Sequence, residues 1–397
     1  MPQEVNETTQ EQQSTVTFDL IYLIGCAVNE IVPSLERVEQ MDLQAVHRMS
    51  VRNSLSAISC MALEDTYGGK LPNTELFRQW EDEKNLAIYK NLLFDAERRE
   101  LFAFLEESEI WYAPLKGILM KDLYPKLGMR QMADNDIFFD ASQQEKVHEW
   151  FLSRNYEVEF YKQNHHNTYQ KKPVYNFEMH TALFNPFADL GLNEYWTNAS
   201  QRLLPWDGTT YGRLFSDDDF YIYLITHAYK HYAGSGTGLR TLLDCYVYNK
   251  AKGNQLDRAH IHDDLARPGI ADYEESVRAL SQKLFASPEQ FSPDSLTPED
   301  ARLLNVYATS GTYGSVESKV TNKVSAMVSE GEAVSGSTKL KYLWRRIFPD
   351  LEVFRVYFPF FYRHKWLLPV GYVYRLINRA IVHRNQLKRE LKTLKKL

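Results

Sequence analysis

The feature of this sequence that most limits its fold is a change of hydrophobic periodicity near residue 109. Over residues 18–108, apolar residues recur at helical spacing, and only two prolines interrupt them. Short apolar runs at 110–113 and 137–139, rich in aromatic and β-branched residues, then predict strands. Helical spacing returns at residue 217. The pattern predicts an α+β fold in which a small mixed sheet is embedded in a largely helical protein.

Between residues 109 and 216 the predicted elements alternate. Helical spacing at 115–124 and 142–154 separates the first strands, and further strands are expected at 156–160, 166–170 and 174–183. For the whole chain we expect six segments. They are a disordered lead (1–16), a helical region (17–108), the α/β core (109–216), a second helical region (217–307), a Ser- and Gly-rich flexible connection or flap (308–338), and a basic aromatic helical region (339–397).

Composition excludes several classes of protein. Apolar residues at 44% and charged residues at 25% are typical of globular proteins. Three cysteines without paired spacing indicate neither a disulfide framework nor a zinc site, and the polar start lacks the pattern of a signal peptide, so we expect a cytoplasmic protein. The net charge of −6 is uneven, because residues 339–397 carry about +12 and the remainder about −18. The basic segment is a solvated face or a contact with an anionic membrane surface.

Two carboxylates precede the second predicted strand. Asp134 and Asp136 are two residues apart, so their side chains point to one face and can share hard cations. Magnesium takes few protein ligands and keeps positions for phosphates, which suits phosphoryl or nucleotidyl transfer. A calcium loop would also begin Asp-x-Asn/Asp, but it places glycine where this chain has Phe139. The pair therefore favours a magnesium site.

An ordered set of short motifs surrounds this pair. They are Pro114-Leu115-Lys116-Gly117, Leu123-Tyr124-Pro125, Gly128-Met129-Arg130, Asp134-x-Asp136, Phe177-Glu178-Met179-His180, a helix with His227, Lys230 and His231, Leu239-Arg240 with Asp244, and Ser310-Gly311-x-Tyr313-Gly314. This succession resembles a bacterial family of uncharacterised nucleotidyltransferases in the polymerase-beta superfamily. The resemblance extends over most of the chain after about residue 75.

The resemblance implies a polymerase-beta-like core, a nucleoside triphosphate substrate and two Mg²⁺ ions, with Mn²⁺ as a substitute. It implies that catalysis and metal binding fall to Asp134, Asp136 and Glu178. Nucleotide binding would involve Lys116, Gly117, Arg130, Lys230 and Arg240, and the supporting residues would be His180, His227, His231 and Asp244, the last of which would hold Arg240. The reaction would transfer a nucleoside monophosphate to an acceptor hydroxyl or phosphate, with release of pyrophosphate.

Two positions depart from the superfamily pattern. Ile118 stands where Ser or Gly usually follows the glycine, and Asn135 replaces an aliphatic residue between the two aspartates. These departures keep a second hypothesis open, a catalytically inactive protein that binds a nucleotide or a partner. A third hypothesis is an acceptor at an RNA end, but the acidic body favours a small molecule, a glycan or a protein.

Other signals have simpler interpretations. His165-His166 lacks zinc spacing and predicts a surface turn, and the glycine-rich run 234–238 predicts a hinge between helices. At the end of the chain, Leu387, Leu391 and Leu394 among basic residues predict an amphipathic helix. That helix either packs on the domain through its Leu stripe, which we favour, or lies on a membrane surface.

Overall fold

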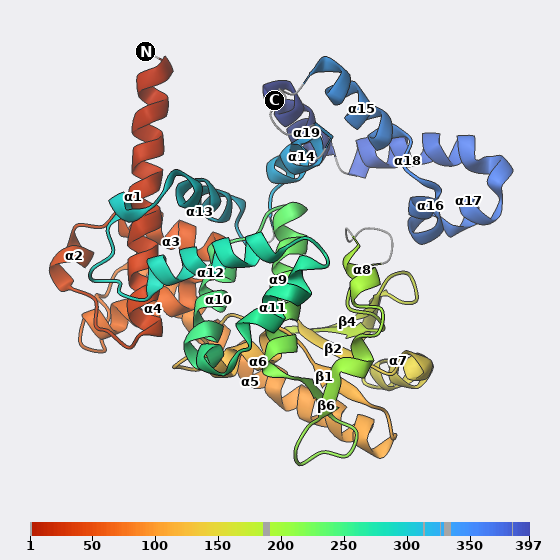
Figure 1. Cartoon of the computed structure of the whole chain (residues 1–397), viewed down its shortest axis with the longest axis horizontal. Helices are drawn as coiled ribbons and strands as arrows, with labels where there is room; N and C mark the ends of the chain where they lie inside the picture. Colours follow the sequence, from red (N-terminus) through yellow and green to blue (C-terminus); the bar gives the residue numbers. More distant parts are fainter. Residues whose placement is uncertain (1, 186–190, 313, 326, 329–334, 383) are drawn as a thin grey trace.

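The computed structural model describes residues 2–185, 191–312, 314–325, 327–328, 335–382 and 384–397. Its helices surround one five-stranded mixed sheet, as Figure 1 shows, so the α+β class is confirmed. A second sheet has only two strands, which follow the short helix of the connecting segment. These elements are α8 (Leu192–Tyr195), β6 (Leu203–Pro205) and β7 (Arg213–Phe215).

The N-terminal region is helical from its second residue. Helix α1 begins at Pro2, and the disordered lead over residues 1–16 stays a prediction. The sequence is compatible with a helix, because no Gly or Pro lies between residues 3 and 24, and Glu and Gln are good helix formers. The second half of α1 is buried against α3, α4 and α12. The helices of this region are α1 (Pro2–Val28), α2 (Leu35–Glu39), α3 (Leu43–Arg52), α4 (Ser56–Thr66) and α5 (Glu75–Glu107).

The main sheet has the strand order β1-β2-β5-β4-β3. Strands β2 and β5 are parallel neighbours at its centre, and the other pairs are antiparallel. Helical elements follow β1 and also connect β2 to β3. The elements are β1 (Tyr112–Pro114), α6 (Gly117–Met120), η1 (Lys121–Leu123), β2 (Asn135–Phe139), η2 (Ala141–Gln143), α7 (Gln144–Ser153), β3 (Glu157–Phe160), β4 (His166–Lys171) and β5 (Tyr175–His180).

The two faces of the sheet have different surroundings. Ile137 and Phe139 of β2 lie on the face that packs with Phe177 of β5 against α5 and α7, through Leu101 and Phe151 among others. Because side chains alternate along a strand, the even-numbered residues of β2 and β5 point to the opposite face. Helices α9 and α10 supply the wall of the cavity on that side.

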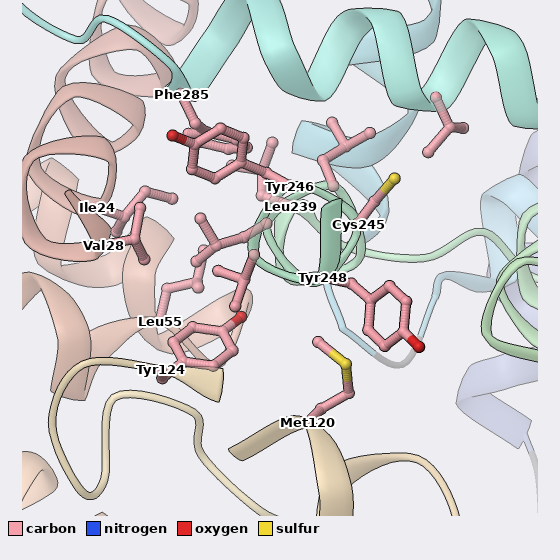
Figure 2. Packing of buried hydrophobic residues seen from close by; sticks show 14 of the residues in the cluster. Ile24, Val28, Leu55, Met120, Tyr124, Leu239, Cys245, Tyr246, Tyr248 and Phe285 are labelled. Atoms are coloured by element: carbon pink, nitrogen blue, oxygen red, sulfur yellow. The ribbon is translucent and has the colours of Figure 1, made fainter. Parts of the chain in front are cut away.

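Helix α10 is the centre of the largest hydrophobic core. Leu239, Tyr246 and Cys245 of α10 contact side chains from α1 and α12, and Figure 2 shows Met120 and Tyr124 reaching the same cluster from the segment after β1. The core thus joins the segment after β1 to helices α1, α10 and α12. The helices of this region are α9 (Asp217–Ala233), α10 (Leu239–Lys252), η4 (Gly253–Gln255), α11 (Arg258–Ala266), α12 (Ala271–Phe285), η5 (Pro293–Ser295) and α13 (Pro298–Ser310).

The C-terminal helices form an arm that extends away from the sheet in Figure 1. Helix α14 occupies residues Val316–Ser325, where a flexible connection or flap was expected over 308–338; Val320 and Val324 are buried and give the segment a core. Helix α19 packs on α14 with Leu394 buried, as the Leu stripe predicted. The arm consists of α14, α15 (Gly336–Ile347), α16 (Leu351–Tyr357), α17 (Pro359–Arg363), η6 (Lys365–Leu367), α18 (Leu368–Val382) and α19 (Arg384–Lys396).

Candidate active site

The parallel pairing of β2 with β5 aligns two carboxylates. Asp136 is opposite Glu178 in the register, and Phe138 is opposite His180. Since His180 is two residues from Glu178, the two side chains lie on the same face. This face borders a cavity of about 320 Å³, whose other wall consists of α9 and α10. Among the side chains that line it are Lys116, Arg130, Asp134, Asp136, His165, His166, Glu178, His180, His227, Lys230, His231, Arg240 and Asp244.

Asp136 is the most strongly held carboxylate of the site. It is 3% exposed, and its Oδ1 accepts hydrogen bonds from Lys116 Nζ at 2.7 Å and from His180 Nε2 at 2.9 Å. Burial alone would raise the pKa of Asp136, but the Lys116 ammonium and the hydrogen bond from His180 outweigh it and hold that pKa well below its usual range. Asp136 therefore stays ionised.

Lys116 reaches this position through an unusual backbone conformation. Its φ of 46° and ψ of −117° place a non-glycine residue in a sparsely populated region, at the turn between β1 and α6. The hydrogen bond from Leu115 N to Asp136 O, 2.9 Å long, ties this turn to β2. Burial lowers the pKa of Lys116, but the facing Asp136 carboxylate more than compensates and raises it above the ordinary value. The turn thus presents a permanent cation to the carboxylates.

The remaining carboxylates differ in their surroundings. Burial, and after it the Asp136 charge, raises the pKa of Asp134 well above its ordinary value. Glu178 Oε2 lies 3.6 Å from His180 Nε2 and 3.9 Å from His166 Nε2. Burial would raise the pKa of Glu178, but the hydrogen bond from His180 contributes to a net lowering.

The donor set fits a divalent cation. Ligand atoms of Asp136, Glu178 and His180 lie within 4.8 Å of one another. His180 is buried, and its Nδ1 has no hydrogen-bond partner within the described ranges, so this nitrogen can form a further bond. Asp134 is outside this trio and stands directly before β2. The structure therefore brings two of the three expected carboxylates together and adds His180 as a possible ligand.

Arg130 forms a buried ion pair with Asp244. Its Nε and Nη2 each donate to a carboxylate oxygen of Asp244 at 2.9 Å, and both side chains are mostly buried. Tyr124 donates a third hydrogen bond to Asp244, 2.8 Å long. Arg240 donates to the carbonyl of Gln131 at 3.0 Å, and a role of Asp244 in holding Arg240 stays a prediction. Asp244 anchors Arg130 and, through it, the segment before β2 to helix α10.

Gly117 is closely packed against two side chains. A Cβ at this position would lie 2.5 Å from Arg130 Nη1 and 2.6 Å from the sulfur of Met132. The neighbouring Ile118 is buried in the core behind the sheet, which accounts for the apolar residue at this point. The turn therefore lies directly against the Arg130–Asp244 pair.

Asn135 also has a physical explanation. It is fully buried, its Oδ1 accepts a hydrogen bond from Arg98 of α5, and its Nδ2 lies 3.5 Å from the carbonyl of Asn176. An aliphatic residue would leave the buried Arg98 without this acceptor. The hydrogen bonds of Asn135 with Arg98 and Asn176, on the face behind the site, thus explain a polar residue at this position.

Histidines form a second feature of the cavity. His227 and His231, one turn apart on α9, approach to 3.2 Å between their Nε2 atoms. Burial, followed by repulsion from Lys116, lowers the pKa of both, to about 4 in His231. The predicted surface turn at 165–166 is wrong, because His165 is 7% exposed and lines the cavity. Sequence spacing could not reveal this, since β4 brings the pair beside His180 only when it pairs with β5.

The cations of α9 and α10 lie across the cavity from the carboxylates. Lys230 and Arg240 both line it, and Lys230 Nζ lies 5.6 Å from the centre of the Phe184 ring. Carboxylates and cations that line one cavity suit a polyanionic ligand that also carries metal ions. The fold and site thus define an α+β protein with a cavity suited to a ligand of the phosphate class.

Comparison with known families agrees with this class. The model of a family described as an uncharacterised nucleotidyltransferase matches residues 39–286, and the chain belongs to that family. The matched span contains every residue predicted above to act at the site. Family membership supports nucleotide transfer from a nucleoside triphosphate as the general activity. No curated protein and no solved structure gives a significant match.

Proposed function

We propose that this protein is a magnesium-dependent nucleotidyltransferase whose sheet is a core of the polymerase-beta type. The observation that carries the proposal is the alignment of Asp136 with Glu178 on adjacent parallel strands, facing Lys230 and Arg240 across one cavity. A triphosphate with bound metal ions needs carboxylates that hold the metal ions and basic side chains that bind the phosphates.

Asp134, Asp136 and Glu178 would hold the metal ions, and His180 would orient Asp136 through its 2.9 Å hydrogen bond. When bound, two Mg²⁺ ions would lower the charge of the reacting phosphate and stabilise the attacking and leaving oxygens. Glu178 would also accept the proton of the acceptor hydroxyl. Its pKa lies below the ordinary value, so its carboxylate is ionised at neutral pH and can hold a cation.

The cations have separate roles in this scheme. Lys230 and Arg240 would neutralise the pyrophosphate as it leaves, because both line the cavity from the helical side. Lys116 touches Asp136 in the structure, and it would exchange that contact for phosphate oxygen when a metal takes the carboxylate. Arg130 is held by Asp244 and acts through position, by supporting the turn at Gly117.

The acceptor is proposed to be a small molecule, a glycan or a protein. The body of the chain outside residues 339–397 carries about −18, which opposes an RNA backbone. A nucleotide-binding protein without turnover is the competing function, and Ile118 in the glycine motif is the observation that favours it. The buried, aligned carboxylates count against it, because they repel one another and would serve no purpose without cations.

The test is incubation of the purified chain with each α-labelled nucleoside triphosphate and Mg²⁺, with pyrophosphate release as the readout. Asp136→Asn should lose release completely, and the exposed carboxylate variant Asp122→Asn, with its side chain 68% exposed, should keep it. Release that survives in Asp136→Asn would refute the assignment. Thermal stabilisation by triphosphate and Mg²⁺, without release under any condition, would favour the binding protein.

A further inference from the structure

Helix α18 leaves an entire apolar face exposed. Val370, Val373, Tyr374, Ile377 and Ile381 are 56%, 55%, 52%, 54% and 73% exposed, respectively. Their spacing of three and four residues places them on one side of the helix. Monomeric proteins in water seldom leave a contiguous apolar stripe of this kind without a partner.

The opposite face of α18 is packed, so the exposed stripe does not reflect a loosely placed helix. A Cβ at Gly371 would lie 2.9 Å from ring atoms of both Phe354 and Phe361, which shows how closely α16 and α17 approach. Arg375 is 8% exposed and donates to the carbonyl of Ile347 at 2.9 Å, at the end of α15. The rotation of the helix is therefore fixed by specific contacts.

Elements next to α18 also carry exposed apolar side chains. Trp366 just before α18 is 77% exposed, and Leu340 and Trp344 of α15 are 67% and 64% exposed. Tryptophan has an apolar body with a polar N–H, a combination that favours the boundary between hydrocarbon and water. We refer to the exposed side chains of α15, η6 and α18 together as the apolar arm face.

The charge around this face is basic. Residues 339–397 contain fifteen Lys or Arg and three Asp or Glu. Of these acids, Glu390 is already paired with Arg346 and Arg379 and accepts a hydrogen bond from Tyr342. Arg345, Arg363 and Lys365 are exposed beside the apolar side chains. An apolar surface bordered by cations complements a bilayer with anionic headgroups.

We propose that the apolar arm face docks this protein onto the surface of an anionic lipid bilayer. Helix α18 has 15 residues and is about 22 Å long at 1.5 Å per residue, so it would lie in the interface. In agreement, none of the helices in the described ranges has the length and hydropathy needed to cross a bilayer. The terminal helix α19 is not the docking element, because it is occupied by packing on α14.

The arm extends away from the sheet in Figure 1, so docking through it would leave the cavity between the sheet and α9 accessible. Docking itself is independent of the chemistry of the site. Together with the proposed function, on which this step rests, it predicts an acceptor presented at a membrane surface.

The experiment is cosedimentation of the full chain with vesicles of phosphatidylcholine alone or of an equal mixture with phosphatidylglycerol. We expect the chain to bind the mixed vesicles, and salt should weaken this binding. Binding to vesicles of phosphatidylcholine alone should be weaker. Ile377→Glu should weaken partitioning about tenfold or more, since it adds a repelled charge at the centre of the stripe. Leu92→Gln on α5, a position that is 53% exposed, is the matched control and should bind normally.

Three outcomes would overturn the proposal. The first is a lack of cosedimentation by the unmodified chain, and the second is equal binding of Ile377→Glu. The third is light scattering that shows, without lipid, an oligomer that Ile377→Glu dissociates, because the face would then join copies of this chain. Circular dichroism checks that the variant folds; the substituted side chain is 54% exposed, so a native spectrum is expected.

Discussion

Replacing Arg130 by Met should destabilise the fold far more than removal of an ordinary ion pair. The substitution leaves the Asp244 carboxylate mostly buried, with two hydrogen bonds of 2.9 Å lost and only the one from Tyr124 known to remain. Removing one partner of a buried pair costs about 3–5 kcal/mol. A loss of 1 kcal/mol lowers Tm by about 2–4 °C in a unit of 150–250 residues, so we expect a decrease of roughly 6–20 °C.

Differential scanning calorimetry is the appropriate assay, because it separates the transitions of a chain with several folding units. Arg78→Met is the matched control: its pair with Glu75 is 2.9 Å long, but the side chains are 59% and 70% exposed, so it should cost at most about 1 kcal/mol. Replacing Asp244 by Leu in the Arg130→Met variant should recover much of the stability, since no buried charge is left unpaired. Equal Tm values for Arg130→Met and Arg78→Met would refute the reasoning.

The remaining predictions concern charge at the site and thiol reactivity. Lys116→Met should reduce pyrophosphate release by about 10²–10³-fold. It should also increase the rise in Tm caused by Mg²⁺, because Asp136 would lose the ammonium that now neutralises it. An unchanged rate of release would exclude a role of Lys116 in phosphate binding. The pKa of His231 is about 4 in the folded state against 6.5 when unfolded, so the folded state binds fewer protons and stability falls as pH drops below about 6.5. This linkage removes about 2 kcal/mol by pH 5, and His231→Asn should flatten the decline measured by urea unfolding. Burial raises the pKa of every cysteine, so a thiol reagent should modify them only on unfolding; rapid labelling of the native chain would contradict the buried positions of Cys26, Cys60 and Cys245.

Local sequence patterns were sufficient to predict the strands of the main sheet. The aromatic run at 137–139 identified β2, and the i, i+2 spacing of Asp134 and Asp136 located the edge of the site. Glu178 could be placed only through family resemblance, because its position beside Asp136 depends on a parallel pairing between strands about forty residues apart. Pairing of that range leaves no periodic signal in either strand.

The features that the sequence did not predict share one physical cause, which is that burial is decided by tertiary contacts. The pair of Asp244 with Arg130 joins residues that are 114 positions apart in the sequence. His165 resembles a surface residue in its polar neighbourhood, yet the pairing of β4 with β5 turns it into the cavity. Composition likewise gave no sign of helix α14, which lies within the segment 308–338 where a flexible connection or flap was predicted.

The site depends on two parts of the chain. The sheet supplies the carboxylates, and α9 and α10 supply the facing cations. Arg130 links these parts, because its segment precedes β2 and its partner Asp244 lies on α10. Gly117 packs against this same link, so a change in the Arg130–Asp244 pair is transmitted to the turn that positions Lys116. Destabilisation and loss of nucleotidyl transfer should therefore appear together in Arg130→Met.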